Sequence, residues 1–247
     1  MKNIVILACA ALAAFPALAS SGPALAPSSN TCEAPLLATS ADVTTSDGAS
    51  YQVETYYRSP YESAARFITA SPALMVVEGP LVWTTNNDGA ALAGVNERRF
   101  VIGHQFHALA LHFDQLISDV APVKNIAFKD GKYKGRKGAY PDGGDATLVL
   151  DKAKRPLGLL LELPDETRIE IAYEDWRDTP SGEAAPFMVT ISHNGDLYTY
   201  RYTDISFATG DARAFQHAVP APAIDEVLAY RTERAEAAAK CAETAAN

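Results

Sequence analysis

The sequence predicts an α+β fold in which a single curved antiparallel meander sheet stays open as a half barrel and carries helices over its concave face. Residues 169–208 contain three consecutive runs of alternating apolar and polar residues joined by polar turns, the pattern of half-buried strands. Similar short runs recur along the chain, giving about 8–10 strands in all. Strands and helices do not alternate and the connections are short, so strands that are neighbours in sequence should pair.

The composition indicates one sheet-based domain with a sizeable core and an acidic surface. The chain has 247 residues, 48% of them hydrophobic, and a formal net charge of −9. Single β domains often exceed ~200 residues, so this length does not require a second core. The acidic balance excludes a general nucleic-acid binder, which needs a broad basic surface, so no nucleic-acid partner is expected.

Residues 1–19 have the pattern of a cleavable secretory signal peptide. Lys2 supplies the positive charge, residues 4–15 the apolar segment and residues 17–19 an A-x-A cleavage site. The sequence around Cys9 loosely resembles a lipoprotein processing box, but it would leave almost no apolar segment before the cysteine. We therefore expect export through the signal peptide to the periplasm.

Removal of that segment leaves two cysteines, Cys32 and Cys241. In an oxidising compartment this pair predicts a disulfide that ties the two ends of the chain together. A redox or metal-binding pair would need a CxxC spacing, which the sequence lacks. Residues 20–50 are predicted as a linker or arm, 51–208 as the half-barrel domain and 209–247 as a C-terminal extension with a helix.

The domain is predicted to begin with a strand and a helix. Residues 51–57 place Tyr, Val, Thr and Tyr on one face, which indicates a strand. Ser59, Pro60 and Glu62 then form a capping box with proline at the first helical position. A helix is therefore expected to extend to about Thr69.

The next segment is predicted to contain strands and then a second helix. Residues 73–85 indicate strand structure with a bend or edge at Gly79-Pro80, followed by a turn at 86–89 and a strand at 96–102. Residues 103–117 show an apolar helical stripe and should lie on the inner surface of the sheet. The stripe consists of Phe106, Leu109, Ala110, Phe113, Leu116 and Ile117.

The second half of the domain is predicted as a series of hairpins. Residues 125–137 indicate a hairpin that turns at Asp130-Gly131, and strands are expected at 147–150 and 157–163. Asn194-Gly195 predicts a two-residue type I′ turn, because both central positions of that turn need positive φ. A helix from residue 223 to about 244, with mainly small apolar residues on its stripe, follows the domain.

Three histidines fall in the predicted helix 103–117, and we expect them on its polar side rather than at a metal site. His104 and His107 lie opposite the apolar stripe, while His112 flanks it. Asp114 is about 10 Å further along the axis than His107, too far to complete one site with both of the first two histidines. No HExxH pattern occurs, so no metal and no cofactor are predicted.

Catalysis has no specific support in the sequence. Glu170 and Glu174 share the outer face of one predicted strand, whereas a glycosidase needs two carboxylates that face each other across a cleft. No GxSxG motif occurs, and Ser192 and His193 have no third partner at a useful spacing. The protein is therefore expected not to be an enzyme and to have no catalytic residues.

A basic cluster in this acidic chain leaves two interpretations open. Its members are Lys124, Lys129, Lys132, Lys134, Arg136 and Lys137. In one interpretation the hairpin contacts an acidic partner or an anionic membrane surface, the latter through Lys132, Lys134, Arg136 and Lys137. In the other it is a solvated hairpin whose lysines protect a sheet edge.

The remaining candidates for a functional site are aromatic and aliphatic. A curved sheet with an apolar helix over its concave face either packs into a solid core or encloses an apolar ligand. The residues predicted to contact such a ligand are Trp83, Phe106, Leu109, Phe113, Trp176, Tyr198, Tyr200 and Tyr202.

The end of the domain follows the order strand, loop, proline-started strand, hairpin and final strand. The residues that show this order are 171–177 (IAYEDWR), Pro186, Ile191, Gly195 and 202–205 (YTDI). Together with the signal peptide and the long meander, this pattern resembles the LolA/LolB superfamily of periplasmic lipoprotein carriers. The resemblance implies an unclosed antiparallel barrel with helices as a lid and an apolar cavity that accepts acyl chains. The cysteine pair, the basic hairpin and the terminal helix depart from that pattern.

The sequence thus predicts an exported periplasmic protein that binds a lipid or other hydrophobic ligand, such as an acyl chain, in a half-barrel cavity, with a carrier role. The alternative is a structural or envelope-interaction module that uses the basic hairpin and has no small-molecule ligand. A hydrolase or metalloprotein is the weakest alternative. The identity of the ligand, and whether the cavity is open or packed, stay undecided at the level of sequence.

Overall fold

The computed structural model describes residues 36–59, 61–141, 143–208 and 217–245. These residues form one antiparallel sheet of 13 strands and four α-helices. The strands are β1 (Leu36–Thr45), β2 (Ser50–Ser59), β3 (Glu62–Ile68), β4 (Ala73–Glu78), β5 (Leu81–Asn86), β6 (Gly89–Leu92), β7 (Ser118–Phe128), β8 (Gly131–Ala139), β9 (Asp145–Leu150), β10 (Pro156–Glu162), β11 (Arg168–Asp178), β12 (Ala184–His193) and β13 (Asp196–Ala208). The helices are α1 (Val95–Gly103), α2 (Phe106–Leu111), α3 (Phe113–Leu116) and α4 (Ile224–Ala245).

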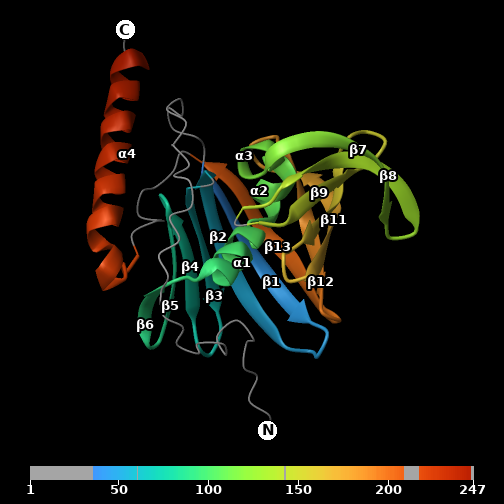
Figure 1. The fold of residues 1–247 in the computed structure, drawn as a ribbon, viewed down its shortest axis with the longest axis horizontal. Helices are drawn as coiled ribbons and strands as arrows, with labels where there is room; N and C mark the ends of the chain where they lie inside the picture. The colour runs from blue at the N-terminus through green and yellow to red at the C-terminus, as the bar shows by residue number, and fades with distance from the viewer. Residues whose placement is uncertain (1–35, 60, 142, 209–216, 246–247) are drawn as a thin grey trace.

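The sheet consists of two meanders joined through β1. The strands β1 to β6 pair in sequence order, as do β7 to β13, and β1 pairs with both β2 and β13. The edges of the sheet are β6 and β7, so the barrel is not closed. Figure 1 shows α1, α2 and α3 inside the curve of the sheet, and α4 outside it beside β4 and β5. We call the side that faces α1–α3 the inner face and the opposite side the outer face.

Alternation along the strands divides the apolar residues between these two faces. The inner face and α1–α3 share one large core, to which β1 contributes Leu37, Ala41 and Val43. Two smaller clusters lie on the outer face. The first contains Ile126, Phe128, Val149, Leu160 and Ala172, and the second, beneath α4, contains Val76, Trp83, Ala223 and Val227.

The prediction of residues 20–50 as a linker is wrong where the chain is described, because residues 36–45 form β1. The sequence LLATSADVTT has few large apolar residues, so its local pattern is weak. In the sheet β1 has a hydrogen-bonded neighbour on each side, β2 and the distant β13. Pairing with a strand far along the chain stabilises this segment, and a local pattern does not reveal such pairing.

The predicted helix at residues 59–69 is also wrong, since this segment is β3. The Ser59 hydroxyl accepts a hydrogen bond from the backbone N–H of Tyr61 at 3.2 Å, within a tight connection from β2. The Glu62 side chain pairs with Arg58 rather than with a helix N-terminus. Ser59 and Glu62 thus end β2 and begin β3 instead of capping a helix, and β3 is stabilised by pairing with β2 and β4.

Residues 96–102 were predicted as a strand, and this is also wrong because they form most of α1. The single helix predicted at 103–117 is divided into α2 and α3, with breaks at Gln105 (φ −83°, ψ 54°) and His112 (φ −126°, ψ 36°). The apolar stripe was read correctly as inward-facing, because Phe106, Leu109 and Phe113 are buried. The sequence pattern located the buried face but not the two breaks.

Other predicted elements are confirmed. The hairpin around Asp130-Gly131 is β7–β8, and the strands at 147–150 and 157–163 correspond to β9 and β10. Asn194 and Gly195 have φ of 53° and 87°, as the predicted turn requires. The terminal helix is α4. The 13 strands exceed the predicted number because β1, β3 and β6 were missed and the turn at Gly79-Pro80 separates β4 from β5, which together outnumber the one predicted strand, 96–102, that is a helix.

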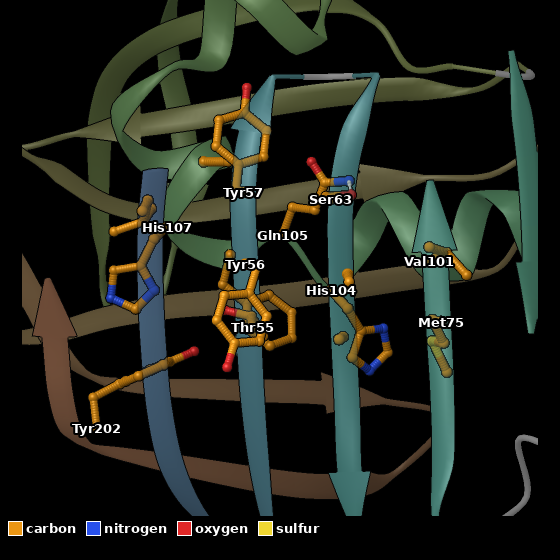
Figure 2. A pocket seen from close by; sticks show the side chains of 15 residues that line it. Thr55, Tyr56, Tyr57, Ser63, Met75, Val101, His104, Gln105, His107 and Tyr202 are labelled. Carbon is orange, nitrogen blue, oxygen red and sulfur yellow. Dashed lines mark hydrogen bonds between the residues drawn. The ribbon is translucent and has the colours of Figure 1, made fainter. Parts of the chain in front are cut away.

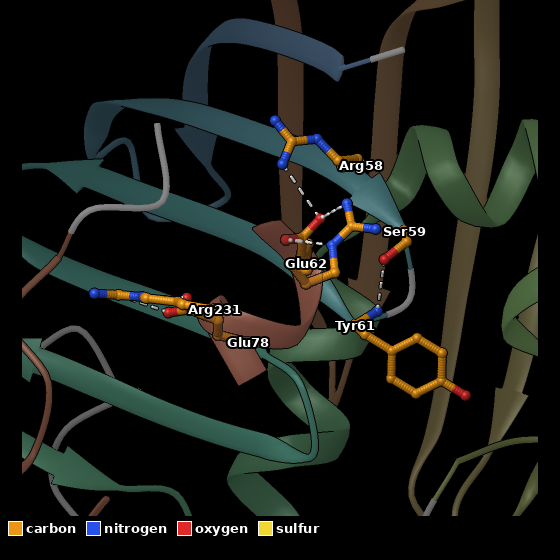
Figure 3. Close-up of polar contacts among 7 residues, drawn as sticks. Arg58, Ser59, Tyr61, Glu62, Glu78 and Arg231 are labelled. Carbon is orange, nitrogen blue, oxygen red and sulfur yellow. Dashed lines mark hydrogen bonds and ion pairs between the residues drawn. The ribbon is translucent and has the colours of Figure 1, made fainter. Parts of the chain in front are cut away.

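The outer face beneath α4 contains two carboxylates bound by arginines of that helix. Arg231 donates two hydrogen bonds to Glu78, at 2.5 and 2.8 Å, and Arg234 donates two to Glu62, at 3.2 and 2.9 Å. Arg58 adds a third contact to Glu62 at 3.3 Å (Figure 3). These ion pairs attach α4 to the ends of β3 and β4.

Candidate functional site

The inner face of the sheet is covered by residues 95–116, which comprise α1, α2 and α3 and which we call the lid. Phe106, Leu109 and Phe113 of the lid are each at most 4% exposed. Phe106 meets Tyr200 of β13 edge-to-face, with ring centroids 5.0 Å apart. Aromatic contacts of this geometry add to the free energy gained by burying apolar area. The lid is therefore packed closely against the sheet.

Each histidine of the lid lies against an aromatic ring of the inner face. His104 meets Phe67 at a ring-centroid distance of 5.7 Å, and His112 stacks on Tyr57 at 6.1 Å. His107 meets Tyr202 edge-on at 4.3 Å. The prediction of histidines on the polar side of a helix is thus wrong for His107, which is 4% exposed. The cause is that α2 is buried on nearly all sides, Phe106 through Ala110 included, so the side opposite the apolar stripe also faces protein.

His107 is held in one tautomer by its hydrogen bond to β12. Its Nε2 lies 2.8 Å from the carbonyl oxygen of Pro186, and because that oxygen can only accept, Nε2 donates. Burial lowers the pKa of His107 to about 4, while the bond to Pro186 opposes that shift. The imidazole is consequently neutral at neutral pH and acts as a buried donor that joins the lid to β12.

A second polar contact joins the lid to β3. Gln105, between α1 and α2, donates from Nε2 to the hydroxyl of Ser63 at 2.6 Å (Figure 2). The Gln105 Oε1 and the hydroxyl of Tyr57 are buried and have no hydrogen-bond partner among the described residues. An unpaired buried polar atom costs about 1–3 kcal/mol, so this part of the interface is weaker than its apolar contacts.

The space between the lid and the sheet is almost filled. The cavity there has a volume of about 20 Å³ and is lined by residues of β2, β3 and the lid, including Tyr57, Ser63, Gln105 and His107. A bound drug-sized molecule needs a pocket of about 300–1,000 Å³. Of the two alternatives that the sequence left open, the structure therefore shows the packed core, and a ligand could enter only if the lid moved.

The residues predicted to contact a ligand are brought together with one exception. Phe106, Leu109, Phe113, Tyr200 and Tyr202 are buried in the inner core, and Trp176 and Tyr198 pack against it half-buried. Trp83 is misplaced, because it lies on the outer face beneath α4 and its Nε1 donates to the carbonyl of Ala218 at 3.0 Å. Its neighbour Val82 is the inward residue of β5, as alternation along a strand requires.

Several inner-face residues that contact the lid were not predicted from the sequence. Phe67 contacts His104, and Tyr57 contacts His112. Phe67 was assigned to a helix, which hid its alternation with Ala65. Tyr57 had been placed on the correct face of its strand, and the same alternation in 169–173 marks Tyr173, which is also buried in the inner core. The period-2 pattern could therefore have identified Tyr57 and Tyr173.

The carboxylates of β11 lie on the outer face, away from the lid. Glu170 and Glu174 border a shallow depression of about 220 Å³, and Glu174 pairs with Lys129 at 2.6 Å. Among the described residues, no group of three His, Cys, Asp or Glu side chains is placed to hold a metal ion. The described helices include none with the length and apolarity needed to cross a membrane. Cys32 lies outside the described residues, so its pairing with Cys241 stays a prediction, as does the signal peptide at 1–19.

The sequence matches no protein-family model. It has no match among curated proteins. Solved structures do share its fold. A LolA superfamily protein from Nitrosomonas europaea matches with a TM-score of 0.53 and 13% identity, over 75% of this chain and 91% of that one.

Two further structures match to a similar degree. A putative outer membrane lipoprotein-sorting protein domain from Vibrio parahaemolyticus has a TM-score of 0.51 and 11% identity, over 76% of this chain and 91% of that one. A DUF1329 family protein from Desulfovibrio piger has a TM-score of 0.50 and 8% identity, over 76% and 92%. At these identities the likeness is one of fold, and the fold is LolA-like, as the sequence resemblance implied.

Proposed function

We propose that this chain is a non-enzymatic periplasmic binding protein that takes the acyl chain of a lipid, or another hydrophobic ligand, between its lid and the inner face of the half barrel, and carries it. The observation on which this rests is the construction of the lid. Three short helices cover a continuous apolar inner face, and in the described structure they are packed against it, so that the lid is closed. A ligand would replace the lid side chains against the sheet.

The inner face has the chemistry that an acyl chain requires. It contributes Val43, Phe67, Val189 and Tyr200 to one buried core, with the lid residues on the other side. Each methylene group moved from water to such a surface gains about 0.8 kcal/mol. An acyl chain could therefore offset the loss of the contacts that Phe106, Leu109 and Phe113 make in the closed arrangement.

The lid has the low intrinsic stability that opening requires. The helices α2 and α3 have six and four residues, and neither has a side-chain hydrogen bond at its N-cap. Isolated helices shorter than about 12 residues are marginal in water, so these helices depend on packing against the sheet. The polar contacts of Gln105 and His107 are single hydrogen bonds. A ligand that binds the inner face would remove the support that keeps the lid helical.

The fold and the predicted export agree with this role. The similar proteins include a LolA superfamily protein and a putative outer membrane lipoprotein-sorting domain, so the same architecture occurs in a protein named for lipoprotein sorting. The predicted signal peptide would deliver the chain to the periplasm, where lipids must cross an aqueous space. These points support a carrier, and the ligand of this chain is proposed on the chemistry of the inner face.

One observation favours the alternative, an envelope-interaction module without a small-molecule ligand. The cavity of about 20 Å³ is too small for an acyl chain unless the lid opens. In that case the exposed lysines of the β7–β8 hairpin would form the functional surface, in contact with an anionic membrane or an acidic partner. Such a protein would bind that surface equally well whether or not the lid can move.

Native mass spectrometry of the purified mature protein, together with analysis of its organic extract, tests the proposed function. A carrier should retain lipid in a 1:1 adduct or acquire one on incubation with a lysolipid. A protein that stays free of lipid after purification and after incubation would exclude the carrier role and leave the interaction module.

A further inference from the structure

The basic residues of the β7–β8 hairpin divide between the two faces of the sheet. Tyr133 of β8 packs on the outer-face residue Phe128, so the odd-numbered positions of β8 point outward. Arg136 is opposite Leu148 of β9, which belongs to the inner core. Residues at even positions of β8 therefore share the inner side, which continues beyond the core as the hairpin extends from the sheet (Figure 1).

The cations of the outer side are neutralised by neighbouring strands. Lys129, in the turn, pairs with Glu174 of β11 at 2.6 Å. Lys137 pairs with Asp145 at 2.8 Å and with Glu162 at 3.7 Å. The pKa of Lys137 is raised, chiefly by its hydrogen bond to Asp145, which keeps the ammonium charged. These two lysines have local structural partners, so Lys137 does not belong to the predicted contact surface.

The inner side of the hairpin has three lysines without such partners. They are Lys124 of β7 and Lys132 and Lys134 of β8, all exposed. Lys124 and Lys134 are directly opposite each other in the ladder, which places two positive charges side by side. Within the described part of the chain no carboxylate lies within ion-pair distance of any of the three. We call Lys124, Lys132 and Lys134 the basic face.

Protection of a sheet edge accounts for only part of the basic face. The edge strand is β7, and lysines on an edge strand discourage pairing with other chains. That explains Lys124, and it also explains Lys132, because β8 before Lys134 pairs only with β7. Lys134 lies where β8 is paired with both β7 and β9, so edge protection does not explain it. Like charges placed opposite each other cost stability, so a counter-charge from outside the chain would relieve an unfavourable arrangement in this acidic protein.

The basic face is connected to the lid by one ion pair. Arg136, on the same side of β8, lies 2.5 Å from Asp114 of α3. The pair is half-exposed, so an anion reaching the hairpin from solvent has access to the guanidinium. The Arg136 guanidinium that contacts Asp114 can instead bind an incoming anion, with two parallel N–H donors where the anion has two oxygens in reach. Occupation of the basic face would thus weaken one of the contacts that hold α3 closed.

We propose that the basic face, together with Arg136, binds the anionic headgroup of the lipid whose chain enters under the lid. This inference rests on the proposed function and specifies its ligand as an anionic amphiphile. The headgroup binds Lys124, Lys132 and Lys134, and it replaces Asp114 at Arg136. Headgroup binding and release of α3 are then one event, which opens the route for the chain.

The experiment compares two lysolipids with the same acyl chain, the anionic lysophosphatidylglycerol and the zwitterionic lysophosphatidylcholine. The test variant is Lys124→Gln/Lys132→Gln/Lys134→Gln. The matched control, Lys152→Gln/Lys154→Gln/Arg168→Gln, removes three exposed positive charges elsewhere. Wild type and control should prefer the anionic lipid by about tenfold or more at low salt, and the test variant should lose that preference. Affinity for the zwitterionic lipid should be equal in all three proteins.

The possible contrary results are separable. Binding of both lysolipids with no preference, or an unchanged preference in the test variant, overturns this inference and leaves the proposed function intact. Binding of neither lysolipid overturns both. Inorganic phosphate that binds the basic face as tightly as the anionic lysolipid would assign the site to free phosphate. Capture by phosphatidylglycerol vesicles without uptake of the lysolipid would assign it to membrane docking, and either result overturns the proposed lipid site.

Discussion

Glu62 and Glu78 are direct cross-strand partners in β3 and β4, and both are buried, at 6% and 3% exposure. Like charges in that position repel each other and would not be tolerated without counter-charges. Arg231 and Arg234 of α4 provide them, each through two hydrogen bonds. Helix α4 is therefore required to neutralise the sheet that it covers.

Removal of one arginine should destabilise the fold more than its partial exposure suggests. Arg231→Ala leaves the buried Glu78 unpaired beside Glu62, and we expect the free energy of unfolding to fall by about 2–4 kcal/mol. Adding Glu78→Gln should restore part of the loss, because the amide has no charge. Chemical denaturation followed by fluorescence measures the effect. Trp83 lies beneath α4 and Trp176 does not, so substitution of either tryptophan separates detachment of α4 from unfolding.

An exposed ion pair of the same sheet provides the control. Arg66 and Glu54 are cross-strand partners at 3.4 Å, with side chains 51% and 32% exposed. Arg66→Ala should cost less than about 1 kcal/mol. Equal losses for the Arg231 and Arg66 variants would contradict the role assigned to α4.

The stability of the closed lid should fall as the pH is lowered. The pKa of His107 is about 4, depressed by burial, against about 6.5 in an unfolded chain. Between these values the unfolded state binds a proton that the folded state does not, so stability is complete above pH 6.5 and decreases toward pH 4 by up to about 3 kcal/mol. Burial also lowers the pKa of His112, with the same sign.

His107→Gln should remove most of that pH dependence. The glutamine amide retains a donor for Pro186 and does not titrate in this range. Denaturation at pH 7 and pH 4.5 gives the difference between the two proteins, in which the titration of the carboxylates cancels. A titration midpoint of His107 near 6.5 in NMR spectra would contradict its burial under the lid.

Phe106→Ala should weaken folding and strengthen ligand binding. The substitution removes a buried ring next to the cavity and should cost about 3–5 kcal/mol of stability. The space that it leaves lies between the lid and the inner face, so a fluorescent fatty acid should bind several-fold more tightly. Phe128→Ala is the matched control, since Phe128 is 3% exposed but belongs to the outer cluster. It should destabilise without changing affinity.

Asp114→Asn should loosen the lid at little cost in global stability. The Arg136–Asp114 pair has side chains 41% and 51% exposed, so its loss should cost less than about 1 kcal/mol. Hydrogen exchange in α2 and α3 should nevertheless become faster. Asp145→Asn removes a carboxylate of similar exposure from Lys137 on the outer face and should leave that exchange unchanged. Equal exchange in both variants would mean that the hairpin does not hold the lid.

The sequence identified the fold class and most of the second meander because the information there is local. The alternation in 169–208 and the Asn194-Gly195 turn depend only on neighbouring residues. β1 was missed because its local pattern is weak. It is stabilised by pairing with β2 and with β13, which lies far along the chain. β3 was misassigned because the Ser59–Glu62 pattern suits both a helix start and a turn.

The site was predicted in part for the same reason. Phe106, Leu109 and Phe113 follow helical spacing in the sequence. All three face the inner core although the lid is divided into separate helices. Trp83 went to the wrong face because the phase of β5 depends on where the turn at Gly79-Pro80 ends. The division of the basic hairpin into an outer, neutralised side and an inner, free side depends on the carboxylates of β9, β10 and β11, which are brought close only by folding.

Photocrosslinking with a fatty acid that has a diazirine near its terminal methyl group tests whether an acyl chain binds beneath the lid. If the chain enters between the lid and the inner face, crosslinked peptides should come from α2 and from the strands that contain Phe67 and Tyr200. Excess unlabelled fatty acid should prevent the crosslinks. Crosslinks confined to the outer-face cluster around Phe128, or none that the competitor removes, would contradict the account.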